Sequence, residues 1–299
     1  MYGYRHVRAK EGRTLDETAS ASFADEISCK ALMDPRHACL KCLDRSPPDL
    51  FGAALWICVE HEPSLDIDAT QSLLSELCLQ LGAALPILPP RELAQPLLRQ
   101  LCALGFRQDD DRPLRPEAAR VDRVVGRRRG QPLSIAIIAL ELARRLDIPL
   151  AAVSFPGHIL VRVPGGDHLL DPCTGRRLYP RDCQALLDHY FKGRLTLQAQ
   201  HLCPSDARYL AQRLSRNLRQ LHQQAADPLA ALRDAERVIE LGSPTLNDHL
   251  ARADLYRLLD CPHGERFDLE RALLLSEDPT QYLALTQRLR TLQWAPAFH

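Results

Sequence analysis

The chain has 299 residues, of which 45% are hydrophobic, and this length suits two domains of ordinary size. Lysine plus arginine equals aspartate plus glutamate, at 38 each, so the charge balance gives no general attraction to nucleic acid or to an anionic membrane. No segment approaches the ~18 consecutive apolar residues of a membrane helix, and the first residues lack the apolar run of a signal peptide. We therefore expect a cytoplasmic protein with neither nucleic-acid nor membrane partners.

Residues 1–47 are polar and show no sustained hydrophobic period, which predicts a polar N-terminal arm. Cys29, His37, Cys39 and Cys42 lie in this arm, and Cys39 and Cys42 have the Cys-x-x-Cys spacing of a zinc or redox site. No second pair follows at the usual separation, so unligated thiols are the alternative. We expect no metal and no cofactor.

Helical patterns dominate the next hundred residues. Three apolar segments, 49–62, 68–85 and 91–106, are separated by breaks that contain proline. Residues 127–149 (RRRGQPLSIAIIALELARRLDIP) then place Pro132 where a first helical turn tolerates it, followed by an apolar run on nearly all sides. This last segment predicts a central, buried helix.

Two strands and a hairpin should follow the central helix. LAAVSF and HILVRV are rich in β-branched and alternating residues, and PGGD at 164–167 is a turn signal before HLLDP. With those four residues as the loop, Leu160 pairs with Asp171, and His158 lies opposite Cys173. His158 and Asp171 would then be diagonal neighbours on one face of the sheet, provided that the register is not shifted by one residue.

The last third of the chain predicts two helical pairs. Their second helices share Asp-x-Glu-Arg, at Asp234 and Asp268, and this offset of 34 residues is the tetratricopeptide period. Two units are fewer than a free-standing solenoid needs, so we expect them to pack on the preceding domain. The predicted helices are 206–224, 228–241, 245–259 and 264–276. The predicted domains are thus 48–200 and 201–299, after the arm.

The order of glycine, buried helix, strand beginning with His, hairpin and Asp-Pro resembles the transglutaminase-like branch of the papain-type cysteine hydrolases. GQPLSIAIIALELARRLDIPLAAVSFPGHILVRV followed by LLDPCTGRRL is similar, more closely, to the bacterial SirB-type (YchA-like) proteins. Those proteins join a transglutaminase-like core to C-terminal tetratricopeptide repeats. The resemblance covers about residues 48–290 and implies an α+β fold: a helical N-terminal part, a central buried helix and an antiparallel sheet, followed by an all-α tetratricopeptide-like region.

The resemblance also implies site residues. In active transglutaminase-like enzymes a cysteine begins the central helix, a histidine on the next strand is its base, and an aspartate on the following strand orients the histidine. By position, His158 takes the base role and Asp171 the orienting role. The cysteine position falls on or near Pro132, and the nearest residue with a nucleophilic atom is Ser134, whose alternative role is a hydrogen bond near the helix start.

Three functional hypotheses remain. We favour a degenerate, non-catalytic protein that acts as a protein-interaction or regulatory module through its core cleft and helical repeats, with His158 and Asp171 as a structural pair. The second is a hydrolase or acyl transferase in which Ser134 or the rival thiol Cys173 attacks an amide or ester. The third is the N-terminal zinc or redox site. Arg162 shares the face of His158 by alternation and would hold a carboxylate, unless it is simply solvated.

Overall fold

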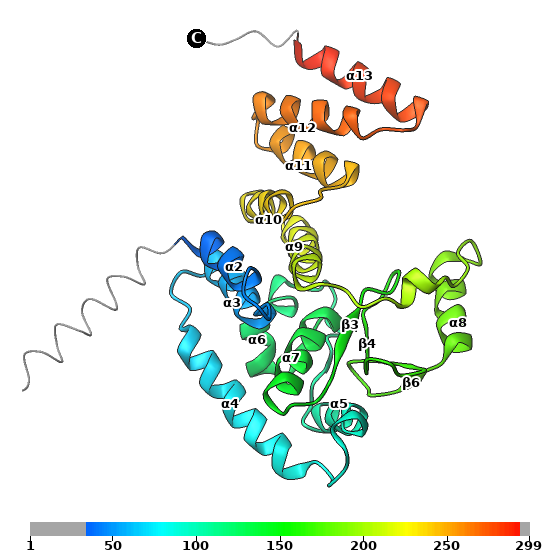
Figure 1. Cartoon of the computed structure of the whole chain (residues 1–299). Helices are drawn as coiled ribbons and strands as arrows, with labels where there is room; N and C mark the ends of the chain where they lie inside the picture. Colours follow the sequence, from blue (N-terminus) through cyan, green and yellow to red (C-terminus); the bar gives the residue numbers. More distant parts are fainter. Residues whose placement is uncertain (1–33, 294–299) are drawn as a thin grey trace, which may run out of the picture.

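The computed structural model describes residues 34–293, which are mostly helical with a small antiparallel sheet (Figure 1). The α+β prediction is therefore confirmed. The helices of the core are α2 (Pro35–Leu43), α3 (Leu50–His61), α4 (Ile67–Ala84), α5 (Ala94–Ala103), α6 (Val121–Arg127), α7 (Pro132–Arg145) and α8 (Pro180–Phe191), with 3-10 turns at Pro90–Glu92, Pro116–Ala118 and Ala199–Leu202.

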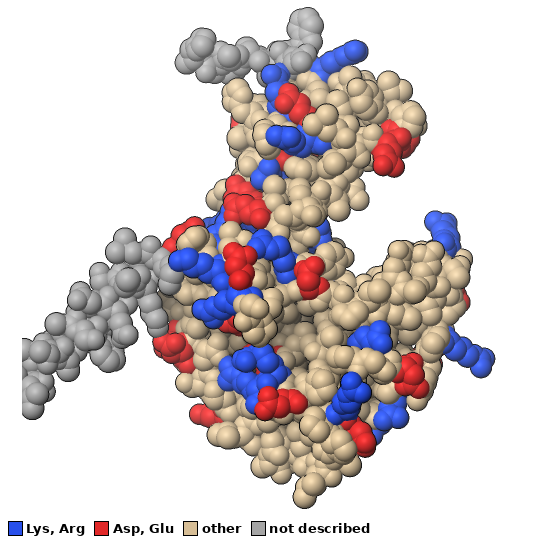
Figure 2. Space-filling view, viewed as in Figure 1, with Lys and Arg blue, Asp and Glu red and all other residues tan. Residues whose placement is uncertain are grey.

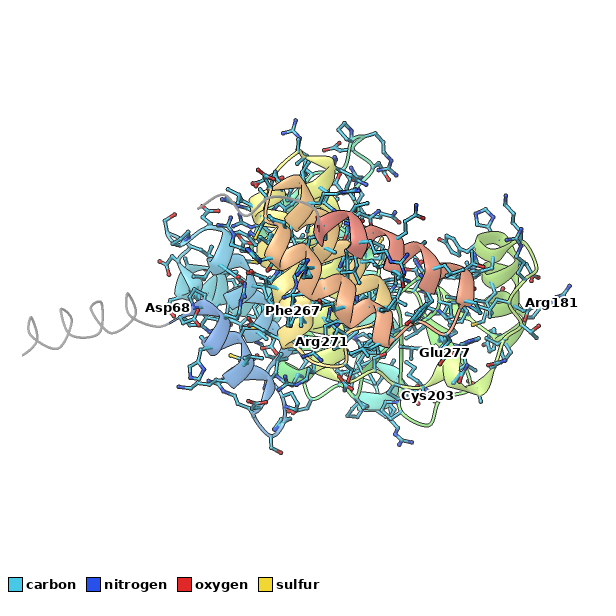
Figure 3. All side chains as sticks on the ribbon, turned by 90° about the horizontal axis from the view of Figure 1, so that it is seen from above. Asp68, Arg181, Cys203, Phe267, Arg271 and Glu277 are labelled. Atoms are coloured by element: carbon cyan, nitrogen blue, oxygen red, sulfur yellow. The ribbon has the colours of Figure 1, made fainter. Side chains whose placement is uncertain are left out.

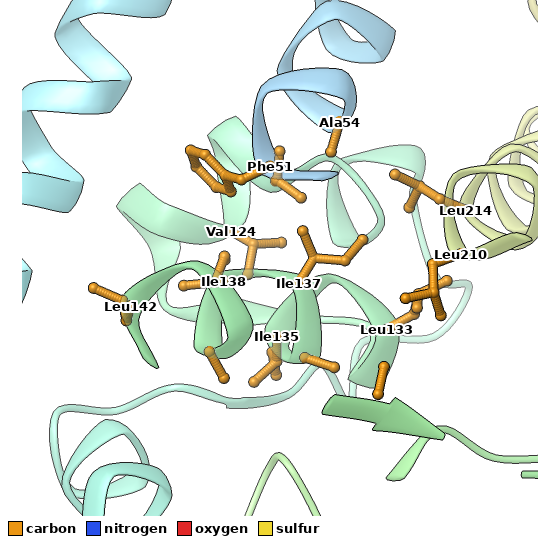
Figure 4. Packing of buried hydrophobic residues seen from close by; sticks show 14 of the residues in the cluster. Phe51, Ala54, Val124, Leu133, Ile135, Ile137, Ile138, Leu142, Leu210 and Leu214 are labelled. Atoms are coloured by element: carbon orange, nitrogen blue, oxygen red, sulfur yellow. The ribbon is translucent and has the colours of Figure 1, made fainter. Parts of the chain in front are cut away.

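Helix α7 is the predicted central helix, and it is buried on almost every side. It begins with Pro132 at its first position, as the sequence indicated. Helix α3 covers one side of it, α6 and the sheet cover others, and α9 packs near its N-terminal end (Figure 4). The side chains in this packing include Phe51, Ala54, Val124, Leu133, Ile137, Ile138, Leu142, Leu210 and Leu214. The start of α7 is thus held rigidly, which matters for the site built around it.

The main sheet has four short strands in the order β3-β4-β5-β6, each antiparallel to its neighbour. Val161 pairs with Leu170, which is the register predicted from the PGGD turn. A separate pair, β1 and β2, is parallel. The strands are β1 (Arg107–Gln108), β2 (Arg129–Gly130), β3 (Ala151–Val153), β4 (Leu160–Arg162), β5 (Leu169–Leu170) and β6 (Arg177–Leu178).

Helix α2 lies inside the segment that the sequence assigned to a polar arm. The prediction is wrong for residues 35–43, because Cys39 and Cys42 pack into the main core beside α3. Burial raises the pKa of the Cys39 thiol to about 12, which keeps it protonated, while His37 lies on the exposed side of the helix. The described members of the alternative zinc set therefore do not point to one place, and Cys29 lies outside the described residues.

The helical arm, residues 207–293, rises from the core as a stack of helices (Figure 1). Its first four helices form two antiparallel pairs at the predicted positions, and a fifth helix, α13, was not predicted. Leucines of α9 belong to the main core, so the arm packs on the preceding domain as expected. The bounds are α9 (Ala207–Gln224), α10 (Pro228–Glu240), α11 (Leu246–Leu258), α12 (Pro262–Leu274) and α13 (Pro279–Gln293).

The two aspartates of the 34-residue repeat have equivalent surroundings. Asp234 and Asp268 are both fully buried, and each accepts a hydrogen bond from a histidine of the preceding helix. His222 Nδ1 lies 2.7 Å from Asp234 and His249 Nδ1 lies 2.8 Å from Asp268. A buried carboxylate is tolerated only when it is paired, so the repeated motif marks the polar centre of each helical pair.

Within residues 34–293, no helix has both the length and the apolar character required to cross a membrane.

Replacing Leu218 with alanine should destabilise the whole chain, because this fully buried residue of α9 joins the arm to the core. We expect Leu218→Ala to lower the free energy of unfolding by about 2–5 kcal/mol. Urea denaturation followed by circular dichroism measures the change. Leu229→Ala, at a site that is 61% exposed, is the control and should change stability little; equal losses in both variants would contradict this packing.

Acid should weaken the attachment of α11 to α9. Arg216 Nε and one of its terminal nitrogens each lie 2.8 Å from Asp248. Burial alone would raise the pKa of Asp248, but hydrogen bonds from Arg216 and Thr245 outweigh it and lower this pKa to about 2. The stabilisation is therefore complete above the unfolded pKa near ~4 and is lost as pH falls towards 2.

The melting temperature between pH 5 and pH 2 measures this loss. Asp248→Asn should be less stable at pH 5 and should show a smaller further decline towards pH 2. The exposed Asp110→Asn variant should follow the wild type. A decline in Asp248→Asn as steep as in the wild type would show that other carboxyl groups carry the effect.

Candidate functional site

A cavity of about 670 Å³ lies at the N-terminal end of α7, between the core and α9. Five parts of the chain supply its walls: β1 with the loop after it, the start of α7, the turn before β4, the end of α8 and one face of α9. The residues are Gln108, Asp109, Arg112, Pro113, Leu114, Gln131, Pro132, Leu133, Gly157, His158, Ile159, Tyr190, Arg213, Asn217, Gln220, Leu221 and Gln224. The cavity therefore lies where the core meets the first helix of the helical arm.

His158 lines this cavity from a tight turn. Its main-chain N–H donates to the carbonyl of Phe155 at 2.9 Å, and Gly157 before it has φ +71°, a conformation that glycine adopts without strain. The ring of Tyr190 stacks near the imidazole, with 6.4 Å between the ring centroids. Burial lowers the pKa of His158, and the charge of Arg213 adds to this against the opposing charge of Asp171. The imidazole is therefore neutral at pH 7.

Asp171 lies close enough to His158 to affect its pKa, as the confirmed register implies. Its carboxylate Oδ1, however, accepts a hydrogen bond of 2.8 Å from the main-chain N–H of Cys173. Within residues 34–293, the imidazole of His158 makes no hydrogen bond to this carboxylate. Asp171 thus stabilises the turn that contains Cys173, and its negative charge raises the pKa of His158 against the effect of burial.

Neither expected nucleophile lies in the wall of the cavity. Ser134 is fully buried in α7, and its hydroxyl donates to the carbonyl oxygen of Ala119 at 2.8 Å. Cys173 is 8% exposed, and burial, with a smaller effect of the Asp171 charge, raises the pKa of its thiol. A protonated, buried thiol is a poor nucleophile. The structure therefore gives both residues packing and hydrogen-bonding roles.

Arg162 also lies away from this cavity. Its guanidinium donates to the carbonyl oxygens of Leu202 at 3.0 Å and of Gly166 at 2.9 Å. The sequence placed it on the face of His158 by strand alternation, but β4 begins only at Leu160, so the alternation does not extend back to the histidine. Arg162 therefore does not line the cavity that contains His158.

Sequence reasoning missed the contribution of α9 to the cavity. Arg213, Asn217, Gln220 and Gln224 form a polar stripe at helical spacing, beside the leucines that face the core. Asn217 Nδ2 donates to Gln131 Oε1 at 2.8 Å, which joins the stripe to the residue before α7. The spacing of these polar residues was visible in the sequence. That they line a cavity could not be predicted, because it depends on where α9 packs against the core.

Arg213 is one of three charged residues in the wall of this cavity, together with Arg112 and Asp109. One terminal nitrogen donates to Ser154 Oγ at 2.6 Å, and no carboxylate within residues 34–293 forms an ion pair with it. Burial lowers the pKa of Arg213, yet a guanidinium remains charged at neutral pH. A half-buried cation without a carboxylate partner favours an anionic group entering the cavity.

The fold, the turn with His158 and the Asp-Pro turn define a transglutaminase-like protein, and the family model described as "Transglutaminase-like superfamily" matches residues 68–216. These residues run from α4 into α9 and include the whole sheet. No solved structure matches the chain.

Among the curated relatives, a UPF0162 protein of Pseudomonas aeruginosa, PA3419, is 57% identical over 261 residues, which cover 87% of this chain and 97% of that protein. A UPF0162 protein of Xylella fastidiosa is 31% identical and covers 82% of this chain and 90% of its own length. YchA of Escherichia coli is 28% identical over 51% of this chain and 58% of its own. The chain belongs to the UPF0162 family of transglutaminase-like proteins, which confirms the resemblance to the YchA-like proteins for the transglutaminase-like part.

Ser134→Ala should affect stability because the Ser134 hydroxyl satisfies the buried carbonyl of Ala119. We expect the free energy of unfolding to fall by about 1–3 kcal/mol, the usual effect of leaving a buried acceptor unpaired. Urea denaturation measures it. The control is Ser72→Ala in α4, where an exposed hydroxyl donates to Asp68 O at 2.9 Å; a loss there as large as at Ser134 would contradict the structural role.

Proposed function

We propose that this protein is a non-catalytic transglutaminase-like module that binds an acidic segment of a protein partner in the cavity between α7 and α9. The observation that carries the proposal is the combination of His158 and Arg213 in one cavity with Ser134 and Cys173 held elsewhere. Among the described residues, neither candidate nucleophile lies beside His158, and no carboxylate forms an ion pair with Arg213. Binding is therefore the better use of these groups.

The chemistry of the cavity supports an acidic ligand. Arg213 and Arg112 both line it, and no carboxylate within residues 34–293 forms an ion pair with either of them. The first turn of α7 adds main-chain N–H groups, whose dipoles favour negative charge. The amides of Gln131 and Asn217 and the neutral imidazole of His158 offer further hydrogen bonds to a peptide. The walls are thus polar and, on balance, positive.

The helical arm supplies a second part of the proposal. We infer that it is tetratricopeptide-like and contacts the same partner, because large apolar side chains are exposed along it. Phe267 is 49% exposed, Leu274 is 77% exposed and Leu283 is 68% exposed. Elsewhere, basic and acidic side chains are interspersed over the face shown in Figure 2, which suits a protein partner better than a polyanion.

The state of the cysteines supports a proposal about the cellular compartment. The cysteines of the described residues are free, and Cys39, Cys58 and Cys173 are buried as small apolar groups. Reduced thiols are usual in the cytoplasm, and we propose that the protein acts there.

Binding of an acidic probe tests the proposal. A fluorescein-labelled peptide of alternating glutamate and glycine should bind the full chain, as measured by fluorescence anisotropy. Arg213→Gln should weaken binding about tenfold or more, because it removes a charge that the ligand meets away from bulk water. The matched control is Arg181→Gln, an exposed arginine at the outer edge of α8 (Figure 3), which should bind like the wild type.

Two results would contradict the proposal. One is equal binding by Arg213→Gln, or by a lysine–glycine peptide of the same length. The other is hydrolysis of an ester or amide substrate that disappears in His158→Ala while that variant keeps the wild-type circular dichroism spectrum, since such turnover would restore the hydrolase hypothesis.

A further inference from the structure

A cluster of two histidines and one aspartate lies where α3, α9 and α10 meet. His61 Nε2 is 2.8 Å from Asp234 Oδ1, and His222 Nδ1 is 2.7 Å from Asp234 Oδ2. The two imidazole rings are in contact, with 4.5 Å between their centroids. The side chains of His61 and Asp234 are 5% and 0% exposed, so this is a built, interior arrangement.

The hydrogen bonds fix which nitrogens carry protons. Asp234 also forms a buried ion pair with Arg237, so its carboxylate is ionised. An ionised carboxylate only accepts, so His61 Nε2 and His222 Nδ1 must be the donors. In a neutral ring the other nitrogen then carries a lone pair. His61 Nδ1 is buried and has no hydrogen-bond partner within residues 34–293.

Hydrogen bonds from both histidines to one carboxylate resemble the surroundings of metal-binding histidines in other proteins. A ligating histidine usually donates its second ring nitrogen to a carboxylate, which orients the ring and raises its basicity. Here one carboxylate does this for two histidines, and both histidines line a second cavity whose wall also includes residues 113–117. In the described chain, His61, His222 and Asp234 offer ligand atoms within 4.8 Å of one another. The two imidazole centroids lie 4.5 Å apart, so both rings are within reach of one ion.

Around the two histidines, most arginines are already paired with carboxylates, so their positive charge does not exclude a cation. Arg237 pairs with Asp234 and with Glu60, and Arg36 also pairs with Glu60. In the wall of the cavity, Arg120 is already engaged by Glu62 and Asp122. Arg115 and Arg233 oppose a cation, while Asp227 and Glu117 favour one. Glu117 Oε2 is itself buried without a hydrogen-bond partner in the described residues, so an anionic oxygen is available.

We propose that His61 and His222 bind a divalent transition-metal ion of the zinc type at this junction. The imidazoles supply two nitrogen ligands, the shared carboxylate of Asp234 supplies negative charge, and water completes the coordination. The bound ion links α3 of the core to α9 of the helical arm. Sequence analysis expected no metal, because its only candidate was the cysteine-containing arm.

Zinc titration of the full chain tests the site. After dialysis against a chelator, we expect one Zn²⁺ to bind by calorimetry and to raise the melting temperature. X-ray absorption at the zinc edge of the wild type should give nitrogen and oxygen ligands without sulfur. His61→Gln and His222→Gln should each weaken binding about 100-fold or more, since a lost ligand costs at least as much as a lost outer partner.

His249→Gln is the matched control. His249 is equally buried and bonds Asp268 at 2.8 Å, but Asp268 has an arginine, Arg252, where Asp234 has a second histidine. This variant should bind zinc like the wild type. The proposal is overturned if the wild type binds no zinc, if sulfur ligands are found, or if both single variants of the cluster bind as tightly as the control. The absorption measurement decides the matter even if a variant fails to fold.

Discussion

The buried ion pairs around Asp234 and Arg237 fix how the helical arm sits on the core. Arg237 is 1% exposed and bonds Asp234, Glu60 and the hydroxyl of Ser215. Charges buried this deeply are tolerated only when every partner is in place, so α3, α9 and α10 have little freedom to separate. Because α9 is held in this way, its polar stripe is kept over the first turn of α7. The cavity that contains His158 therefore depends on a network that lies outside it.

The transglutaminase-like arrangement at the start of α7 is kept only in part. The central helix still presents its positive end, and the turn before β4 still presents a histidine. The helix begins at Pro132, however, and the first hydroxyl after it, that of Ser134, turns inward to Ala119. The position of the attacking group is therefore filled by a ring without a reactive atom. What remains is a polar, positively charged recess closed on its other side by α9.

Much of this architecture could be predicted from the sequence, since its signals are local. The apolar run after Pro132 predicted α7, and the PGGD turn predicted the pairing of Val161 with Leu170. Helix α2 was missed because its nine residues are too short to establish a period. The cavity was only half predicted: His158 was found by position, but Arg213 and Asn217 join it through tertiary docking that no local pattern encodes. Asp234 was found as a repeat signal, whereas its partner His61 comes from 173 residues away.

Chemical labelling of the native chain tests most directly whether His158 has a group to activate. The protein is treated with a fluorophosphonate for serines and with iodoacetamide for thiols, and modified peptides are identified by mass spectrometry. Our account predicts that the exposed Cys102 and Cys203 are alkylated while Ser134 and Cys173 stay unmodified. Modification of Ser134 or Cys173 that is lost in His158→Ala would show an activated nucleophile and would contradict a binding role for this cavity.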